Sequence, residues 1–185
     1  MAREEVVLVN EQNEVLGTME KYAAHSDRTP LHRAFSSFIF HPQKGLLIQQ
    51  RSHKKKTWPL MWSNSCCGHP SLDETPASAA RRRLEYELGI TDVALTMVLP
   101  KYRYTCELYG IVENEICPVL TGVTVQEPIP NPEEVETCKW LSWKSWLKEI
   151  EKHPDTYSFW CREETQLLEA SPLFHSLLLE YKAIK

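Results

Sequence analysis

Several short segments of the chain are rich in hydrophobic residues, either as short apolar runs or, as at residues 111–119, in alternation with polar residues, and both patterns are typical of strands. The segments with these patterns are residues 6–9, the residues around Val15, and residues 31–40, 46–50, 111–119 and 138–143. The connection at residues 41–45 contains Pro42 and Gly45, which are typical turn residues. We therefore expect two strand pairs within the first 50 residues and further strands in the second half of the chain.

The strongest helix signal covers residues 76–88. Thr75 is a typical N-cap, Pro76 suits the first helical position, and Gly89 ends the pattern. Spacings of three and four residues predict one apolar face, made of Ala77, Ala80, Leu84 and Leu88.

The same spacing places Arg83 and Glu87 one turn apart on a neighbouring face. Two further helices are predicted over residues 143–152 and 173–182. No repeat or long linker interrupts the sequence, so we interpret residues 1–185 as one α+β domain. Helices that follow and separate strands of mixed spacing favour a layered α/β sandwich over a doubly wound sheet.

Composition narrows the classes of function. The chain has 185 residues, with 21 Lys and Arg against 25 Asp and Glu, and a formal net charge of -4. A general nucleic-acid binder needs a dominant basic face, and a membrane span needs ~20 apolar residues; the sequence offers neither. The six cysteines are widely spaced, unlike a disulfide framework. We expect a cytoplasmic protein that binds any anionic ligand through a local basic cluster.

The segment around residues 111–117 carries two carboxylates on one face of a predicted strand. With a period of two, Glu113 and Glu115 point the same way. A divalent cation between them would relieve their repulsion. His25, His32 and His69 are candidate imidazole ligands for Mn²⁺, Zn²⁺ or Mg²⁺ because of their residue type, although their spacing does not show that they converge. The alternative is that the glutamates form the solvent-facing side of an amphipathic strand.

Two more segments offer chemistry. In Cys67-Gly-His-Pro, the thiol of Cys67 has His69 as an activating neighbour, although small buried cysteines before a turn would look the same. Residues 51–56 are a basic run that, with Lys21 and Arg83, would suit phosphate oxygens. The alternative for the run is a solvated loop.

From residue 68 to residue 90 the chain reads Gly-x5-Glu-x7-Arg-Arg-Leu-x-Tyr-Glu-x-Gly-Ile. This segment resembles the Nudix box, Gly-x5-Glu-x7-Arg-Glu-U-x-Glu-Glu-x-Gly-U, where U is apolar. The spacing is complete, but Arg83 and Tyr86 replace two box carboxylates. A Nudix hydrolase uses those carboxylates to hold the metals that activate water, so the replacements argue against pyrophosphate hydrolysis.

Further segments resemble the bacterial type 1 isopentenyl-diphosphate delta-isomerases, a branch of the Nudix superfamily. The most specific are Cys-Gly-His-Pro at residues 67–70 and Val-Glu-Asn-Glu at residues 112–115. The others are Lys21-Tyr-Ala-Ala-His25, Leu31-His32, Arg51 with Lys55, Trp58-Pro-x-x-Trp-x-Asn64, Arg103-Tyr104 and Trp140. The resemblance extends over about residues 4–160 and implies a Nudix-like α/β/α sandwich with a mixed sheet.

The resemblance also implies two metal sites. A protein-bound Mn²⁺ or Zn²⁺ would be ligated by His25, His32, His69, Glu113 and Glu115. A Mg²⁺ that also binds the substrate diphosphate would be ligated by Glu87, with the Cys67 carbonyl as a further ligand.

The implied reaction interconverts isopentenyl and dimethylallyl diphosphate, in isoprenoid biosynthesis, by protonation and deprotonation through a tertiary carbocation. Cys67 and Glu115 would transfer the protons, with help from Tyr104, and Trp160 would lie against the hydrocarbon end. The residues that would contact the diphosphate are Lys21, Arg51, Lys55 and Arg83.

Two segments depart from the family pattern. The family's Phe-Ser-Pro-Trp is Tyr-Ser-Phe-Trp at residues 157–160, and the loop at residues 104–110 is one residue short. Two other functions stay open: a Nudix-type diphosphate hydrolase, and a metal-stabilised module that binds a diphosphate without catalysis. The chain would act on a small molecule, as a monomer or a homodimer.

Overall fold

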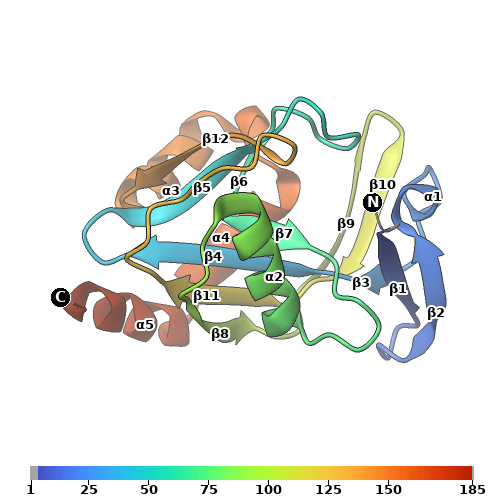
Figure 1. Ribbon diagram of the computed structural model, residues 1–185, viewed down its shortest axis with the longest axis horizontal. Helices are drawn as coiled ribbons and strands as arrows, with labels where there is room; N and C mark the ends of the chain where they lie inside the picture. Colours follow the sequence, from blue (N-terminus) through green and yellow to red (C-terminus); the bar gives the residue numbers. More distant parts are fainter. Residues whose placement is uncertain (1–3, 185) are drawn as a thin grey trace.

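The computed structural model describes residues 4–184, and Figure 1 shows their arrangement. The strands are β1 Glu5–Val9, β2 Val15–Glu20, β3 His32–Arg33, β4 Phe35–His41, β5 Gly45–Arg51, β6 Trp62–Ser63, β7 Cys66–Gly68, β8 Ala94–Leu99, β9 Arg103–Leu108, β10 Ile111–Ile116, β11 Val119–Val123 and β12 Val135–Leu141. The helices are α1 Lys21–Ala24, α2 Pro76–Leu88, α3 Trp143–Lys152, the 3-10 turn η1 Pro154–Thr156, α4 Phe159–Glu169 and α5 Pro172–Ala183. Within residues 4–184, no helix is both long and apolar enough to cross a membrane.

The strands form two sheets. The smaller has the order β2-β1-β3-β10-β9, and the larger follows the path β12-β5-β4-β11-β8, with β6 paired to β5 and β7 to β4. β3 is parallel to β10 and β4 is parallel to β11, whereas the other pairs are antiparallel. Both sheets are therefore mixed.

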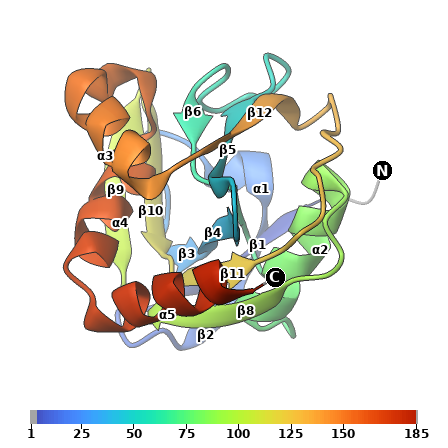
Figure 2. The same ribbon diagram turned by 90° about the vertical axis from the view of Figure 1, so that its left-hand side faces the viewer.

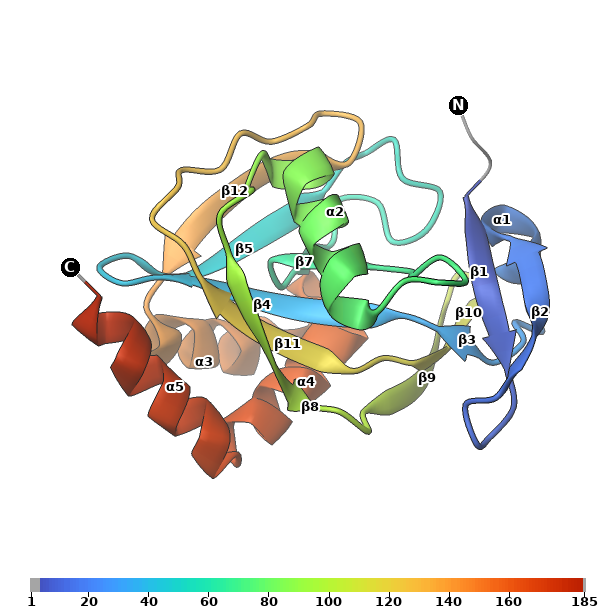
Figure 3. The same cartoon turned by 60° about the horizontal axis from the view of Figure 1, so that its bottom comes forward.

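Helices cover both faces of the larger sheet. Helix α2 lies on one face, and α3, α4 and α5 lie on the other (Figures 2 and 3). Side chains alternate along a strand, so the central strands β4 and β5 supply both cores. The residues packed on the α3–α5 side are Phe38, Phe40, Leu46 and Ile48. Those packed on the α2 side are Phe35, Ile39 and Leu47. This arrangement confirms the predicted α/β/α sandwich.

Helix α2 begins and ends where its sequence predicts. The Thr75 hydroxyl accepts a hydrogen bond from the Ser78 amide, and Pro76 opens the helix. Gly89 ends it in the left-handed region, with φ of 65°, which glycine adopts at little cost. Leu84 and Leu88 are fully buried, and each contributes roughly 1.5–3 kcal/mol of hydrophobic stabilisation.

Two predicted strands are each divided between the two sheets. The segment 111–119 is β10 in the smaller sheet and β11 in the larger, with a break at Cys117 and Pro118. Pro118 has no amide hydrogen, and its carbonyl accepts from the Ser36 amide. The segment 31–40 breaks likewise at Ala34, whose amide donates to the Ile116 carbonyl. The two crossings therefore lie side by side, and the single long strands predicted from alternation were wrong.

Other boundaries differ from the prediction. The last strand is Val135–Leu141 rather than 138–143, because Ser142 is already the N-cap of α3. The segment 104–110 is no loop: it is most of β9 and a tight turn in which Tyr109 and Gly110 both have positive φ, as expected for a two-residue hairpin turn. The pattern did not predict β8 or α4.

Candidate active site

Strand register brings the two glutamates of β10 next to a histidine and a tyrosine. β10 runs beside β3 with Glu115 opposite His32, and beside β9 with Glu115 opposite Tyr104. Glu113 and Glu115 are both buried, so the solvent-facing alternative for this strand is wrong. His25, just after α1, and His69, just after β7, complete a cluster of five side chains whose nearest donor atoms all lie within 4.8 Å of one another.

Backbone carbonyls fix the orientation of two of these histidines. Nδ1 of His25 lies 2.6 Å from the Lys21 carbonyl oxygen, and Nδ1 of His32 lies 2.9 Å from that of Pro30. A carbonyl can only accept, so Nδ1 carries a hydrogen, and in the neutral ring Nε2 then presents its lone pair to the cluster. This is the tautomer that a metal ligand requires.

The Nε2 atoms point at carboxylate oxygens. His25 Nε2 is 2.9 Å from Glu113 Oε2, and His69 Nε2 is 3.1 Å from Glu115 Oε1. His32 Nε2 is 3.4 Å from Glu115 Oε1 and, among the described residues, has no hydrogen-bond partner. Lone pairs that face carboxylates in a buried site repel one another unless a cation lies between them. Three imidazoles and two carboxylates therefore fit a divalent metal ion.

The surroundings shift the pKa values of the two cluster carboxylates in opposite directions. Burial and the charge of Glu115 raise the pKa of Glu113. Burial also acts to raise the pKa of Glu115, but the neighbouring rings of His32 and His69 outweigh it and hold that pKa well below its usual range. Burial lowers the pKa of His69 to about 3. The imidazole of His69 is thus neutral at physiological pH, as a metal ligand must be.

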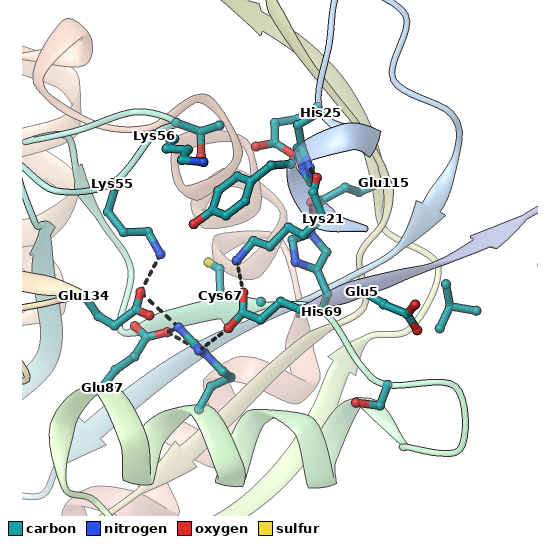
Figure 4. Close-up of a pocket in the computed structure, with 18 of the residues that line it drawn as sticks. Glu5, Lys21, His25, Lys55, Lys56, Cys67, His69, Glu87, Glu115 and Glu134 are labelled. Carbon is teal, nitrogen blue, oxygen red and sulfur yellow. Dashed lines mark hydrogen bonds and ion pairs between the residues drawn. The ribbon is translucent and has the colours of Figure 1, made fainter. Parts of the chain in front are cut away.

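The basic residues are neutralised by carboxylates. Lys21 Nζ is 2.6 Å from Glu4 Oε2, and Arg83 lies 3.1 Å from Glu4, 2.6 Å from Glu87 and 3.1 Å from Glu134. Lys55 also pairs with Glu134. Figure 4 shows Lys21 and Lys55 directed into the space that Cys67 and His69 also face.

The cations also repel one another. Burial lowers the pKa of Lys55, and the charges of Arg51 and Lys21 lower it further. The Arg51 guanidinium donates to the carbonyls of Thr57 and Trp58, which hold it in place. A small polyanion would relieve the repulsion between these cations, because it adds negative charge where positive charges converge.

An aromatic wall lies beside the polar groups. The rings of Tyr104 and Trp160 are both buried, with centroids 5.9 Å apart, and Trp58 packs edge-on against Trp160 at 5.5 Å. The Tyr104 hydroxyl donates to Glu115 Oε2 at 2.9 Å. This wall therefore joins the hydrocarbon-like surface of the site to the carboxylate of the cluster.

Cys67 lies at the middle of β7, which pairs with β4. Its thiol is 3.2 Å from Asn64 Oδ1 and 3.5 Å from Ser36 Oγ. Burial raises the pKa of this thiol. His69 is hydrogen-bonded to Glu115 and, among the described residues, forms no hydrogen bond with the thiol, so the activating pair predicted from spacing is not formed.

One cavity of about 530 Å³ collects the predicted residues. Its lining includes Lys21, His25, Arg51, Lys55, Cys67, His69, Arg83, Glu87, Tyr104, Glu113, Glu115 and Trp160. His32 is not in the lining, because it is fully buried behind the other members of the cluster. Within the lining, the Glu87 carboxylate accepts hydrogen bonds from Arg83 and, at 3.0 Å, from the side-chain amide of Gln49.

The sequence did not reveal several residues of this cavity. Glu4 and Glu134 lie in segments without a motif, and only the fold brings them to Arg83. Glu164, which is buried outside the cavity lining, was also missed, although the buried residues of α4 follow helical spacing. A helical reading of that segment would have placed a glutamate on the buried face.

Comparison with known proteins agrees with the geometry. Residues 30–161 match the NUDIX domain. The chain is 44% identical over 162 residues to an isopentenyl-diphosphate Delta-isomerase from Saccharopolyspora erythraea, which covers 87% of this chain and 84% of that protein.

Solved structures share the fold. A Deinococcus radiodurans protein has a TM-score of 0.64 at 24% identity, covering 81% of this chain and 90% of that one. A Nudix hydrolase from M. smegmatis has a TM-score of 0.55 at 15% identity, covering 89% and 92%. These two similarities support the fold alone, whereas the 44% identity extends over most of the chain. The chain therefore belongs to the isopentenyl-diphosphate Delta-isomerase family and carries the Nudix fold.

Proposed function

We propose that the cavity converts isopentenyl diphosphate into dimethylallyl diphosphate by adding a proton at one carbon and removing one from another. The observation that carries the proposal is that a cavity of about 530 Å³ contains the His/Glu cluster, four basic side chains, Cys67 and the aromatic wall together. Each part matches a requirement of that reaction. In this proposal the protein acts in the cytoplasm, without nucleic-acid or membrane partners, as a monomer or homodimer.

The basic residues would bind the diphosphate. Lys21, Arg51, Lys55 and Arg83 bring four positive charges to a group with about three negative ones, and separated Arg and Lys donors suit phosphate oxygens. The carboxylate of Glu4 forms ion pairs with Lys21 and Arg83. Binding of the diphosphate by these two side chains would therefore require Glu4 to move away from them.

The five-residue cluster would hold Mn²⁺ or Zn²⁺, and Glu87 with the Cys67 carbonyl would hold the Mg²⁺ of the diphosphate. Bound there, the ions supply positive charge that neutralises the cluster carboxylates and the substrate diphosphate. The orphaned Nε2 of His32 and the carbonyl-fixed ring of His25 support the first assignment. The second rests on Glu87, whose carboxylate lies against Arg83 at the cavity wall.

Glu115 and Cys67 would transfer the protons. Tyr104 donates to Glu115 and orients it, and we assign Glu115 as the acid that protonates the alkene. Because its pKa is low, Glu115 must first take up a proton, and its protonated form is then a strong acid. Cys67 extends from a different strand, which suits removal of a proton from another position, so we assign it as the base. A terminal alkene is a poor base, so the acid must be held close to it in a site that excludes water.

The aromatic wall would stabilise the tertiary carbocation. A turnover near 10 s⁻¹ requires a barrier of about 16 kcal/mol. The ring faces of Trp160 and Tyr104 in this buried wall contribute on the order of 2 kcal/mol by cation–π attraction. Burial of both rings also keeps out water, which would capture the cation.

The hydrolase alternative is less well supported. Of the two changed box positions, Tyr86 is exposed and Arg83 forms an ion pair with Glu87, so neither adds a metal-binding carboxylate. Incubation of the purified protein with isopentenyl diphosphate and Mg²⁺ tests the two functions. The isomerase forms dimethylallyl diphosphate without release of phosphate. Release of phosphate without isomerisation would support the hydrolase, and binding without either product would support a non-catalytic module.

Substitution of Glu87 by glutamine should weaken Mg²⁺-dependent substrate binding, raising KM about tenfold or more, because a charge-assisted contact to the metal is lost. The Mg²⁺ concentration for half-maximal rate should rise with it. Glu85→Gln is the matched control, since Glu85 lies on the same helix and is exposed. An unchanged Mg²⁺ dependence in folded Glu87→Gln would remove Glu87 from this role.

A further inference from the structure

Helix α4 carries a carboxyl group that the proposed reaction does not use. Glu164 is fully buried, and its Oε2 accepts a hydrogen bond from Ser36 Oγ at 2.7 Å. Its Oε1 is buried without a hydrogen-bond partner among the described residues. Burial raises the pKa of this carboxyl well above its usual range, and an Oε2 that accepts from Ser36 is compatible with a proton on Oε1. A buried carboxyl group with a single hydrogen-bond partner lowers the stability of the fold, which suggests that Glu164 has a function.

The partner of Glu164 touches the thiol of Cys67. Ser36 on β4 lies directly opposite Cys67 on β7, and its Oγ is 3.5 Å from Cys67 Sγ. A serine hydroxyl has one hydrogen and two lone pairs. Because that hydrogen is directed to Glu164, Ser36 faces the surrounding groups with lone pairs. The Asn64 amide uses one of them, donating to Ser36 Oγ at 2.8 Å.

Asn64 presents an acceptor to the same sulfur. Its Nδ2 also donates to the Ser37 carbonyl at 2.9 Å, which fixes the orientation of the amide, since a carbonyl can only accept. The opposite atom, Oδ1, then faces Cys67 Sγ at 3.2 Å. Two oxygen acceptors, from Asn64 and Ser36, therefore converge on one thiol.

We propose that Glu164 is a positioning residue, which acts through Ser36 to hold the Cys67 thiol hydrogen in this polar network and to leave the sulfur lone pairs free to face the cavity. To remove a proton from the carbocation, the sulfur must present a lone pair to it while its own hydrogen points to the oxygen acceptors. These acceptors take up the thiol hydrogen as the substrate proton arrives, so that Cys67 ends the step as a thiol. A freely rotating S–H group would have this orientation only part of the time. Without the acceptor on Glu164, the Ser36 hydroxyl is free to turn its hydrogen toward Sγ. The role in catalysis rests on the proposed function of Cys67, whereas the orientation of the thiol does not.

Infrared spectroscopy of the metal-loaded, substrate-free protein tests the orientation directly. The S–H stretching band of Cys67 is isolated as the difference between the parent protein and Cys67→Ala. In Glu164→Met, which keeps the length of the side chain and removes the acceptor of Ser36, we expect this band to move to higher frequency. The reason is that the Ser36 oxygen turns away from the thiol hydrogen, which then has Asn64 Oδ1 as its one remaining acceptor. In Glu164→Gln, whose amide oxygen can still accept from Ser36, we expect the parent frequency.

Kinetics should follow the same order. We expect Glu164→Met to lower kcat about tenfold with KM within about twofold, the effect of one lost hydrogen bond on the barrier. Glu164→Gln should restore most of kcat. Ser36→Ala should resemble Glu164→Met, and the double variant should be no slower than either, because both substitutions interrupt one path.

Thr165→Val is the matched control, since it removes an equally buried polar group from the next position of α4 without touching the thiol network. It should lower Tm with no change in the S–H band or in kcat. A parent-like S–H band in folded Glu164→Met, or additive losses in the double variant, would overturn the proposal. A shifted band in a protein without isomerase activity would instead uphold the orientation and count against the proposed function.

Discussion

Replacing Cys67 with alanine is expected to reduce isomerase turnover by about 10²–10⁴-fold, the contribution of a positioned proton-transfer group. The substitution removes one sulfur atom from a half-buried position, and it leaves Asn64 Oδ1 with its hydrogen bond from Ser63 Oγ at 2.8 Å. Fold and diphosphate binding should therefore persist. Steady-state turnover, thermal unfolding and equilibrium binding of the substrate separate these effects.

Cys138→Ala is the control for this experiment. Cys138 is also half-buried, and it lies on β12 outside the cavity lining. It should retain the parent turnover, which shows that loss of a thiol as such is harmless. Parent-like turnover in Cys67→Ala would remove Cys67 from the mechanism, whereas lost binding would assign it to the substrate pocket.

Substitution of His25 by alanine should remove the ion from the His/Glu cluster and lower turnover by at least about 100-fold. The ring is held by the Lys21 carbonyl on one side and Glu113 on the other, so its loss removes one of the three imidazole ligands of the ion that would neutralise the two buried carboxylates. Elemental analysis of the purified variant gives the metal content per chain. The same preparation gives its turnover.

His53→Ala is the matched control, since His53 is exposed and pairs with Glu136 on the surface. It should keep both metal and activity. His32→Ala tests the cluster from the opposite side, from strand β3. Full metal occupancy in both folded cluster variants would contradict a metal site at these residues.

Local sequence signals predicted local structure well. Thr75, Pro76 and Gly89 mark the ends of α2, because each acts through its own backbone geometry. The period of two in residues 111–117 placed Glu113 and Glu115 on one face, and the fold confirms it. What alternation did not predict is where a strand changes sheet, since the breaks at Ala34 and Pro118 depend on two crossings that stabilise each other.

The spacing of residues along the chain did not predict which side chains meet in the folded protein. His25 and Glu113 are 88 positions apart, and no local pattern specifies the tertiary contacts that bring them together. The residue types therefore suggested a metal site, whereas the resemblance indicated which residues would form it. The ion pairs of Glu4 and Glu134 with Arg83 arise the same way, from tertiary contacts alone. Glu164 was missed for a different reason, because the helix that buries it was not predicted.

The proposed isomerase function depends most on the transfer of protons to and from carbon within the cavity. Incubation with isopentenyl diphosphate and Mg²⁺ in D₂O, followed by NMR, measures this transfer directly. We expect deuterium in a methyl group of dimethylallyl diphosphate and, as the reaction reverses, at the carbon that loses its proton, with Cys67→Ala showing neither. Formation of dimethylallyl diphosphate without deuterium, or no hydrogen exchange by the metal-loaded parent protein, would contradict it.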